Sequence, residues 1–329
     1  DVYKRQGLFP GLQRTGMRAR QEHCKQWEKE HDEPFFGAAA GRGAPDAVWR
    51  ASMKAEAAVE RGKCAVVITQ DMKAFFQAID HKLLLARAEA SGFPVPLVRL
   101  AIAAYSAKRW LYTRTGVAEP VAPDRGIAPG CALATTLVKV YYRDALKSFV
   151  KKHSRNGIVD LNAYIDDFQL TIVGERHAVI AAAVEAMKDL PAIVKDEIKA
   201  ELVPEKAAMK ATDDALERTI RRMLGEELVG TKRKHIDSLG VDLPVGRERR
   251  QWQKKATENK REANMTRKAK RQVRLLKTGG RRVHRLTSQN LLSTWGFGGC
   301  CVGCPDARLC KLKRAICLLY TSPSPRDRG

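Results

Sequence analysis

Several common features are scarce or missing in this chain of 329 residues. No stretch approaches the roughly 18 consecutive apolar residues that a membrane-spanning helix requires, so we expect no membrane span. No signal peptide is visible at the beginning, and no internal repeat is present. The eight cysteines do not form the framework of a small secreted protein, since five of them lie in the last thirty residues. We therefore expect a reducing, intracellular location, either nucleus or cytoplasm.

Acidic residues are also scarce relative to basic ones. The chain has 60 Lys and Arg against 37 Asp and Glu, which gives a formal net charge of +23 at pH 7. Such an excess points to a polyanionic partner, with nucleic acid first and an anionic membrane surface second. A basic protein without such a partner is the alternative.

The two ends differ from the rest of the chain. The first six residues, DVYKRQ, and the last twelve, LLYTSPSPRDRG, resemble translated sequencing-adaptor read-through, so we expect 1–6 and 318–329 to take no part in the fold. Because position 1 is not Met, we expect a fragment of a longer reading frame. The remaining residues suffice for a large core in two or three subdomains.

Short apolar strands and amphipathic helices follow one another along the middle of the chain. The run CAVVIT predicts a buried strand that ends at Asp71, and Asp80 is typical of the residue that begins a helix. The clearest helix is expected over 131–150, where apolar residues recur at helical spacing. Further elements are expected as helices over 46–62 and 175–189, a strand and turn over 200–209 and a hairpin over 235–246. This order predicts an α+β fold with one central sheet.

Two adjacent carboxylates stand in the stretch AYIDDFQLTIVG, residues 163–174. Alternating apolar residues on both sides predict two strands, with Asp166 and Asp167 at the turn between them. If this hairpin lies beside the strand that ends at Asp71, three carboxylates converge at one end of the sheet. Crowded acids are costly unless a cation neutralises them, and oxygen ligands suit Mg²⁺. Two such ions about 3.5–4 Å apart can clamp a phosphoryl displacement. A hydrated surface turn is the alternative, since Asp is common in turns.

Five segments carry a resemblance to a known family. DMKAFFQAIDHKLLLARA, RGIAPGCALATT, AYIDDF, VPEKAAM and HIDSLGVDL occur in the order of the palm motifs of reverse transcriptases. Over roughly 46–245 the chain resembles this family, and most of all its non-LTR retrotransposon and retrointron branch. The resemblance implies a right-hand polymerase, with a palm of antiparallel sheet packed on helices. The parts would be partial fingers (7–62), palm (63–245, with an inserted fingers part at about 93–128), and a thumb start with a Cys-rich tail (246–317).

The resemblance also implies roles for single residues. Asp71, Asp166 and Asp167 match the acids that hold two Mg²⁺ ions, for which Mn²⁺ can substitute. Lys206 matches a lysine near the triphosphate that is suited to neutralise or protonate the leaving pyrophosphate, and a solvated surface lysine is the alternative. Phe76 matches the bulky residue beneath the sugar, where a ring leaves no room for a 2′-OH, and ordinary core packing is the alternative. The other residues expected to bind substrate are Met72, Lys73, Gly130 and Tyr164.

The implied activity is RNA-templated DNA synthesis, in which dNTPs extend a DNA primer 3′-OH on the RNA template of a retroelement. The chain departs from the family in the loop from Gly126 to Gly130, where Pro129 replaces the usual Gln, and at 134–136, where Ala-Thr-Thr replaces Ser-Pro. The basic fingers segment upstream is short or absent. A decayed element that only binds nucleic acid is one rival. An RNA-dependent RNA polymerase is another, although that class carries an acid at the position of Phe76.

The segment 247–285 is strongly basic, with sixteen Lys or Arg against three Glu. We expect a helix that contacts the phosphate backbone of the template–primer duplex, and a solvated helix or disordered tail is the alternative. The cations expected to bind nucleic acid include Lys254, Lys255, Arg267, Lys268, Lys270 and Arg271.

A cysteine cluster, CCVGCPDARLC, follows the basic segment. The cluster consists of Cys300, Cys301, Cys304 and Cys310, and its C-x-x-C is half of a zinc signature. The second half is missing unless Cys310 and either His284 or Cys317 complete it. Free cysteines are the simpler expectation.

Overall fold

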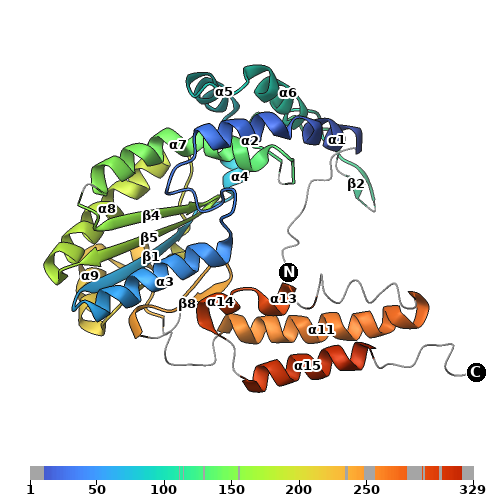
Figure 1. The fold of residues 1–329 in the computed structure, drawn as a ribbon. Helices are drawn as coiled ribbons and strands as arrows, with labels where there is room; N and C mark the ends of the chain where they lie inside the picture. The colour runs from blue at the N-terminus through green and yellow to red at the C-terminus, as the bar shows by residue number, and fades with distance from the viewer. Residues whose placement is uncertain are drawn as a thin grey trace, which may run out of the picture.

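Four antiparallel strands form the central sheet of the computed structural model (Figure 1). The structure describes residues 11–110, 112–113, 115–128, 130–154, 156–233, 236–247, 256–279, 291, 293–303 and 306–320. Within this part of the chain the spatial order of the strands is β4 (Val159–Tyr164), β5 (Asp167–Gly174), β1 (Cys64–Asp71) and β6 (Ala208–Ala211). The antiparallel pairings confirm the predicted α+β fold with a central sheet.

Strand β1 is apolar on both faces because it lies inside the sheet, between two layers of helix. Val66 and Ile68 belong to the larger core, which also contains the buried faces of α7 (Ala134–His153) and α8 (Arg176–Asp196). Ala65 and Val67 point the other way, toward α3 (Ala44–Glu60). Burial on both faces explains why CAVVIT is a continuous apolar run.

A smaller core lies on the α3 side of the sheet. We use this name for the buried cluster of Val48, Ala51, Ala55, Ala58, Ala65, Val67, Ala208, Ile236, Val241, Leu243, Val245 and Cys301. The cluster includes the hairpin of β7 (Ile236–Ser238) and β8 (Val241–Leu243), which the sequence predicted over 235–246. It therefore joins the sheet, the α3 helix and a cysteine near the end of the chain.

Two helices differ in length from the sequence-based expectation. Helix α7 begins at Ala134, because 131–133 form a turn in which the Ala134 amide donates to the Cys131 carbonyl over 3.1 Å. Helix α8 continues past Pro191 to Asp196. Pro191 removes one backbone donor, but Leu190 and Val194 are fully buried, and this burial favours continuation of the helix.

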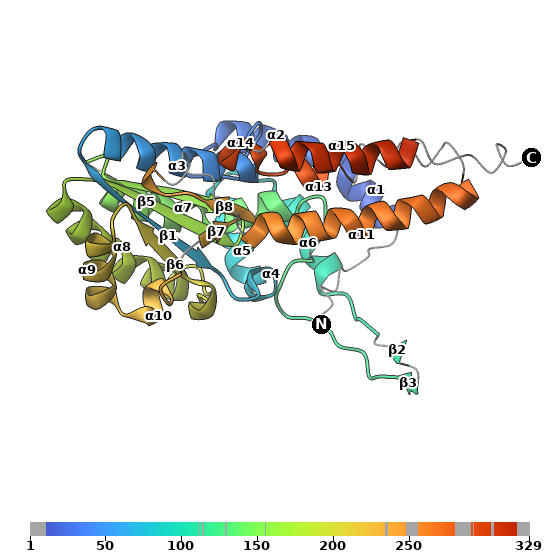
Figure 2. The same cartoon turned by 90° about the horizontal axis from the view of Figure 1, so that it is seen from below.

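The remaining elements up to residue 229 surround the sheet. They are α1 (Gly11–Ala19), α2 (Gln21–Glu30), α4 (Phe75–Ala78), α5 (His81–Ala90), α6 (Val95–Tyr105), β2 (Tyr112–Thr113), β3 (Gly116–Val117), the 3-10 helix η1 (Pro204–Lys206), α9 (Asp214–Leu224) and α10 (Glu226–Val229). Helix α5 begins as predicted, with the Asp80 carboxylate accepting the Leu83 amide over 2.8 Å. Figure 2 shows the β2–β3 hairpin projecting away from the rest of the chain.

The C-terminal part is helical and basic. It contains α11 (Ala256–Gly279), α13 (Ser293–Gly296), α14 (Gly299–Val302) and α15 (Asp306–Tyr320), with α15 packed beside α11 (Figure 1). The prediction of a helix in the basic segment is confirmed over 256–279. Helix α15 extends to Tyr320. The helix therefore continues into the segment 318–329, which the sequence analysis expected to take no part in the fold. None of the described helices combines the length and the apolar character needed to cross a bilayer.

Candidate active site

The end of β1 meets the turn of the β4–β5 hairpin. Asp71, the last residue of β1, lies directly opposite Asp167, the first residue of β5. Tyr164, the last residue of β4, is paired with Asp167 from the other side, so Ile165 and Asp166 form the two-residue turn. The hairpin with adjacent acids at its turn is therefore confirmed.

The turn is held in place by its backbone. The Met72 amide donates to the Asp166 carbonyl over 2.9 Å, which ties the turn to the chain after β1. Ile165 has φ of 61°, in the left-handed region that β-branched residues rarely adopt. Tyr142 of α7 lies beneath the turn, in contact with the Ile165 backbone, and burial together with the negative charge of Asp166 raises the pKa of its hydroxyl. Sequence reasoning missed Tyr142, because nothing in its local pattern distinguishes it from other apolar residues of α7.

Lys206 lies against the same three acids. The segment before it pairs with the end of β1: the Val203 amide donates to the Asp71 carbonyl over 2.9 Å. The Lys206 ammonium forms an ion pair with the Asp71 carboxylate. The hydrogen bond that Lys206 donates to Asp71, followed by the charges of Asp71, Asp167 and Asp166, raises the pKa of Lys206. The structure thus brings together the four residues that the sequence suggested as catalytic.

A cavity of about 340 Å³ opens beside these residues. Asp71, Asp167 and Lys206 line one side of it, and the turn of the β7–β8 hairpin, with Leu239 and Gly240, lines another. Residues 237–240 of this hairpin therefore face the carboxylates across the cavity. Arg233 also lines the cavity, and its guanidinium donates to the Glu205 carbonyl over 2.8 Å. Sequence reasoning missed Arg233, since a lone arginine in a loop carries no signal.

The oxygen donors at this site suit Mg²⁺ or Mn²⁺ in type. Across the described residues, no group of three or more His, Cys, Asp or Glu side chains is gathered closely enough to hold a metal ion without rearrangement. The Asp71 carboxylate is engaged by Lys206 in this arrangement. A metal ion bound to this carboxylate would therefore be opposed by the positive charge of the Lys206 ammonium.

The residues suggested as substrate contacts are spread around the site. Met72 is fully buried, so only its backbone can face a substrate, whereas Lys73 is exposed and forms an ion pair with Glu201 over 3.2 Å. Tyr164 is half-buried beside Asp167. Phe76 is half-buried in α4 and is not among the described residues that line the 340 Å³ cavity.

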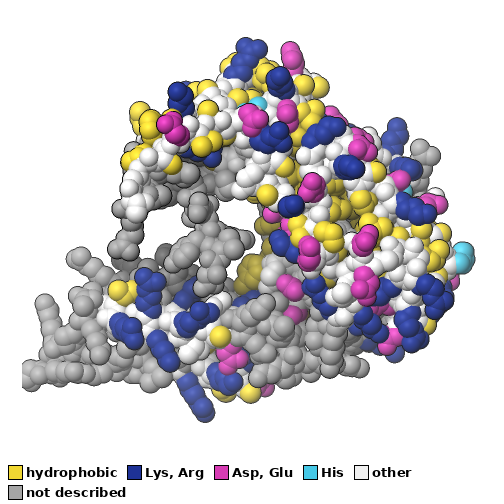
Figure 3. Space-filling model, turned by 180° about the vertical axis from the view of Figure 1, so that it is seen from behind, with side chains coloured by type: hydrophobic (Ala, Val, Ile, Leu, Met, Phe, Trp, Pro, Cys, Tyr) yellow, Lys and Arg dark blue, Asp and Glu magenta, His cyan; other side chains and the backbone are white. Residues whose placement is uncertain are grey.

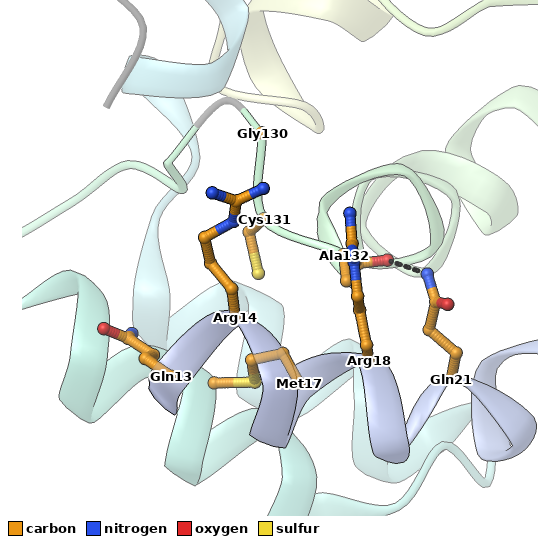
Figure 4. A pocket seen from close by; sticks show the side chains of 8 residues that line it. All are labelled: Gln13, Arg14, Met17, Arg18, Gln21, Gly130, Cys131 and Ala132. Carbon is orange, nitrogen blue, oxygen red and sulfur yellow. Dashed lines mark hydrogen bonds between the residues drawn. The ribbon is translucent and has the colours of Figure 1, made fainter. Parts of the chain in front are cut away.

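Gly130 lies away from the acids, in the loop before α7. It lines a second cavity, between that loop and α1, which is shown in Figure 4. Pro129, the departure in this loop, lies outside the described residues.

The basic face suggested for nucleic-acid binding lies on α11. Arg267, Lys268, Lys270 and Arg271 are all exposed, and Figure 3 shows Lys and Arg side chains gathered over this region. The other two suggested contacts, at 254–255, lie outside the described residues.

The cysteine cluster is only partly described, since 304 and 284 fall outside the described residues. The Sγ atoms of Cys300 and Cys301 lie 3.8 Å apart, and Cys301 donates to the Pro45 carbonyl over 3.1 Å. Burial raises the pKa of the Cys301 thiol to about 12, as is typical of a buried structural cysteine. Cys301 therefore behaves as a core residue.

An antiparallel sheet with helices on both faces, and with three carboxylates at one of its ends, defines the palm of a right-hand nucleic-acid polymerase. Comparison with known families specifies the class further. The family model described as reverse transcriptase (RNA-dependent DNA polymerase) matches residues 11–243, well over half of the chain. The chain belongs to this family.

Solved structures of telomerases share the fold. Telomerase from Candida tropicalis in complex with a fragment of telomeric RNA has a TM-score of 0.51 at 10% identity, covering 93% of this chain and 50% of that one. Telomerase from Candida albicans with the same type of fragment has a TM-score of 0.50 at 11% identity, covering 94% and 53%. Apo telomerase from Candida tropicalis has a TM-score of 0.51 at 10% identity, covering 92% and 54%. The chain thus spans about half the length of each. A search of curated proteins finds no match.

Proposed function

We propose that this chain synthesises DNA on an RNA template, adding dNTPs to a primer 3′-OH as the polymerase of a retroelement. The observation that carries the proposal is the meeting of Asp71, Asp167 and the Asp166 turn at one end of the sheet, with Lys206 against them. Family membership and the cavity beside these acids support it. The location we propose is intracellular, in nucleus or cytoplasm.

Asp71, Asp166 and Asp167 would hold two Mg²⁺ ions, with Mn²⁺ as a substitute. When bound, such a pair of ions activates the attacking oxygen and stabilises the leaving oxygen of the phosphoryl transfer. The β7–β8 turn would keep the primer end beside Asp71 and Asp167, since it lines the same cavity. Positioning of this kind supplies much of the rate enhancement in phosphoryl transfer.

Lys206 would serve as the proton donor to the leaving pyrophosphate. Its raised pKa means that the ammonium keeps its proton at neutral pH, as a donor must before the transfer. The same ion pair with Asp71 makes Lys206 a weaker acid, because the proton is held more tightly. The pair must therefore open before Lys206 can give up its proton.

The division into parts is also a proposal. Residues 7–62 would contribute to the fingers, 63–245 would form the palm with an inserted fingers part at about 93–128, and 246–317 would begin the thumb. Phe76 would exclude ribonucleotides. In the thumb, the exposed cations of α11 would follow the duplex backbone.

Primer extension with the purified chain tests the proposal. A labelled DNA primer on an RNA template should be extended with dNTPs and Mg²⁺, and Asp166→Asn should abolish extension while leaving duplex affinity nearly unchanged. Asp160→Asn is the matched control, since Asp160 lies on β4 and pairs with Lys54 away from the site. A wild-type chain that binds the duplex but never extends it would favour the alternative, a decayed element that only binds nucleic acid.

A further inference from the structure

A second cavity lies between the N-terminal helices and the loop that precedes α7 (Figure 4). Its volume is about 140 Å³, enough for one phosphate group. Helix α2 is fixed to the loop by Gln21, whose amide donates to the Ala132 carbonyl over 3.2 Å. Met17 of α1 is 4% exposed and belongs to the larger core, so α1 is anchored as well. The two walls of the cavity are therefore held at a defined separation.

Two arginines of α1 give this cavity its charge. Arg14 and Arg18 are one helical turn apart, and both point from α1 toward the loop. Both are exposed, and neither forms an ion pair with another described residue. Among the described residues that line the cavity, none is acidic. Side chains four apart on a helix are neighbours, so the two like charges repel each other unless an anion lies between them.

The loop leaves room for such an anion. Gly130 has φ of 92°, in the left-handed region that favours glycine, and it presents no side chain to the cavity. The same loop reaches back toward the active site, because the Ile127 amide donates to the Phe76 carbonyl of α4 over 2.7 Å. The cavity thus lies at one end of a loop whose other end contacts the helix that follows Asp71.

We propose that Arg14 and Arg18, together with the loop residues Gly130 and Cys131, bind a phosphate group of the substrate complex. The guanidinium fork matches a phosphate by paired, charge-assisted hydrogen bonds, which a lysine ammonium cannot reproduce. The inference rests on the proposed function, which brings two sources of phosphate to this chain. The group belongs either to the single-stranded template or to the incoming nucleotide.

The double variant Arg14→Gln/Arg18→Gln separates these sources. Binding is measured with an RNA–DNA template–primer that has a single-stranded template overhang, and with the same duplex without the overhang. If the template supplies the phosphate, only affinity for the overhang duplex falls, by about fourfold at 0.15 M salt, and the log–log salt slope decreases by about 0.7, as for one phosphate on a single strand. If the nucleotide supplies it, both duplex affinities hold, and more dNTP is needed to stabilise the complex on a chain-terminated primer.

Two further variants sharpen the result. Arg99→Gln removes an exposed arginine of α6 that has no ion-pair partner among the described residues, and it should leave all three measurements at wild-type values. Arg14→Lys/Arg18→Lys should recover the salt slope but only part of the affinity. If the double Gln variant matches Arg99→Gln in all three measurements, the phosphate site is refuted. The polymerase proposal can also fail separately from this site. If the wild-type chain extends no primer, but the double Gln variant still loses affinity for the overhang duplex relative to it, the polymerase proposal is refuted and the phosphate site stands.

Discussion

If Lys206 and a divalent cation compete for the Asp71 carboxylate, removal of the lysine should raise the affinity for the cation but lower the rate of primer extension. Lys206→Gln removes the ammonium that pairs with the Asp71 carboxylate. The variant should therefore bind Mn²⁺ more tightly than the wild type. If Lys206 is the proton donor, the same variant should extend primers more slowly.

The magnitude follows from the exposure of the pair. The side chain of Lys206 is 61% exposed and that of Asp71 is 16% exposed, so water screens the ion pair on one side. Ion pairs of this exposure contribute about 0.2–1 kcal/mol, so their loss should strengthen cation binding by about 1.4- to 5-fold. Because the pKa of Lys206 is raised, the competing charge persists from pH 7 to 9, and the difference between variant and wild type should be constant over that range.

Free Mn²⁺ can be measured by electron paramagnetic resonance during titration of each protein, with no need for catalysis. Lys199→Gln is the control, since Lys199 is exposed and has no ion-pair partner in the described part of the chain. If Lys206→Gln binds Mn²⁺ no more tightly than the wild type and the control, Lys206 does not compete for Asp71, and the reasoning about this ion pair is wrong.

Three other perturbations test separate parts of the chain. Phe76→Ala should raise ribonucleotide incorporation far more than it alters dNTP use, and an unchanged preference in competition assays would make Phe76 a packing residue only. Lys152 and His153 lower the pKa of Asp189, so its stabilisation is present above the ordinary carboxyl pKa and is lost as pH falls through the lower folded value. The Tm of Asp189→Asn should thus lie about 1–3 °C below wild type at pH 7 and converge with it only once the pH falls below the lowered folded pKa of Asp189, and parallel curves would contradict this. Arg261 is a buried residue, 8% exposed, and Arg261→Gln removes the guanidinium that donates to the Gly240 and Phe297 carbonyls. It should lower the free energy of unfolding in urea by about 1.5–3 kcal/mol, whereas Arg267→Gln, exposed on the same helix, should change it little.

The elements nearest the acids could be predicted because their signals are local. Continuous burial of β1 and the alternation around Asp166 and Asp167 appear within a dozen residues of sequence, and the structure has both. The pairing of Lys206 with Asp71 spans 135 residues, so only the order of family motifs could suggest it.

The second cavity could not be predicted, since no local pattern connects its walls. The bond that holds α2 to the loop joins Gln21 and Ala132, 111 residues apart. Helix α1 is short, its Leu12 is exposed, and its arginines look like those of any solvated helix face. Their proposed role in binding phosphate depends on the loop that the tertiary fold places opposite them.

The smaller core bears on how this protein can be shortened. The family match stops at residue 243, yet Val245 and Cys301 complete the packing against α3 and β8. A polypeptide cut at the end of the match would leave Val48 and Val241, both fully buried in the intact chain, in contact with water. The family match therefore ends inside this buried cluster, and we expect an expression fragment that extends through 303 to be more stable than one cut at 243.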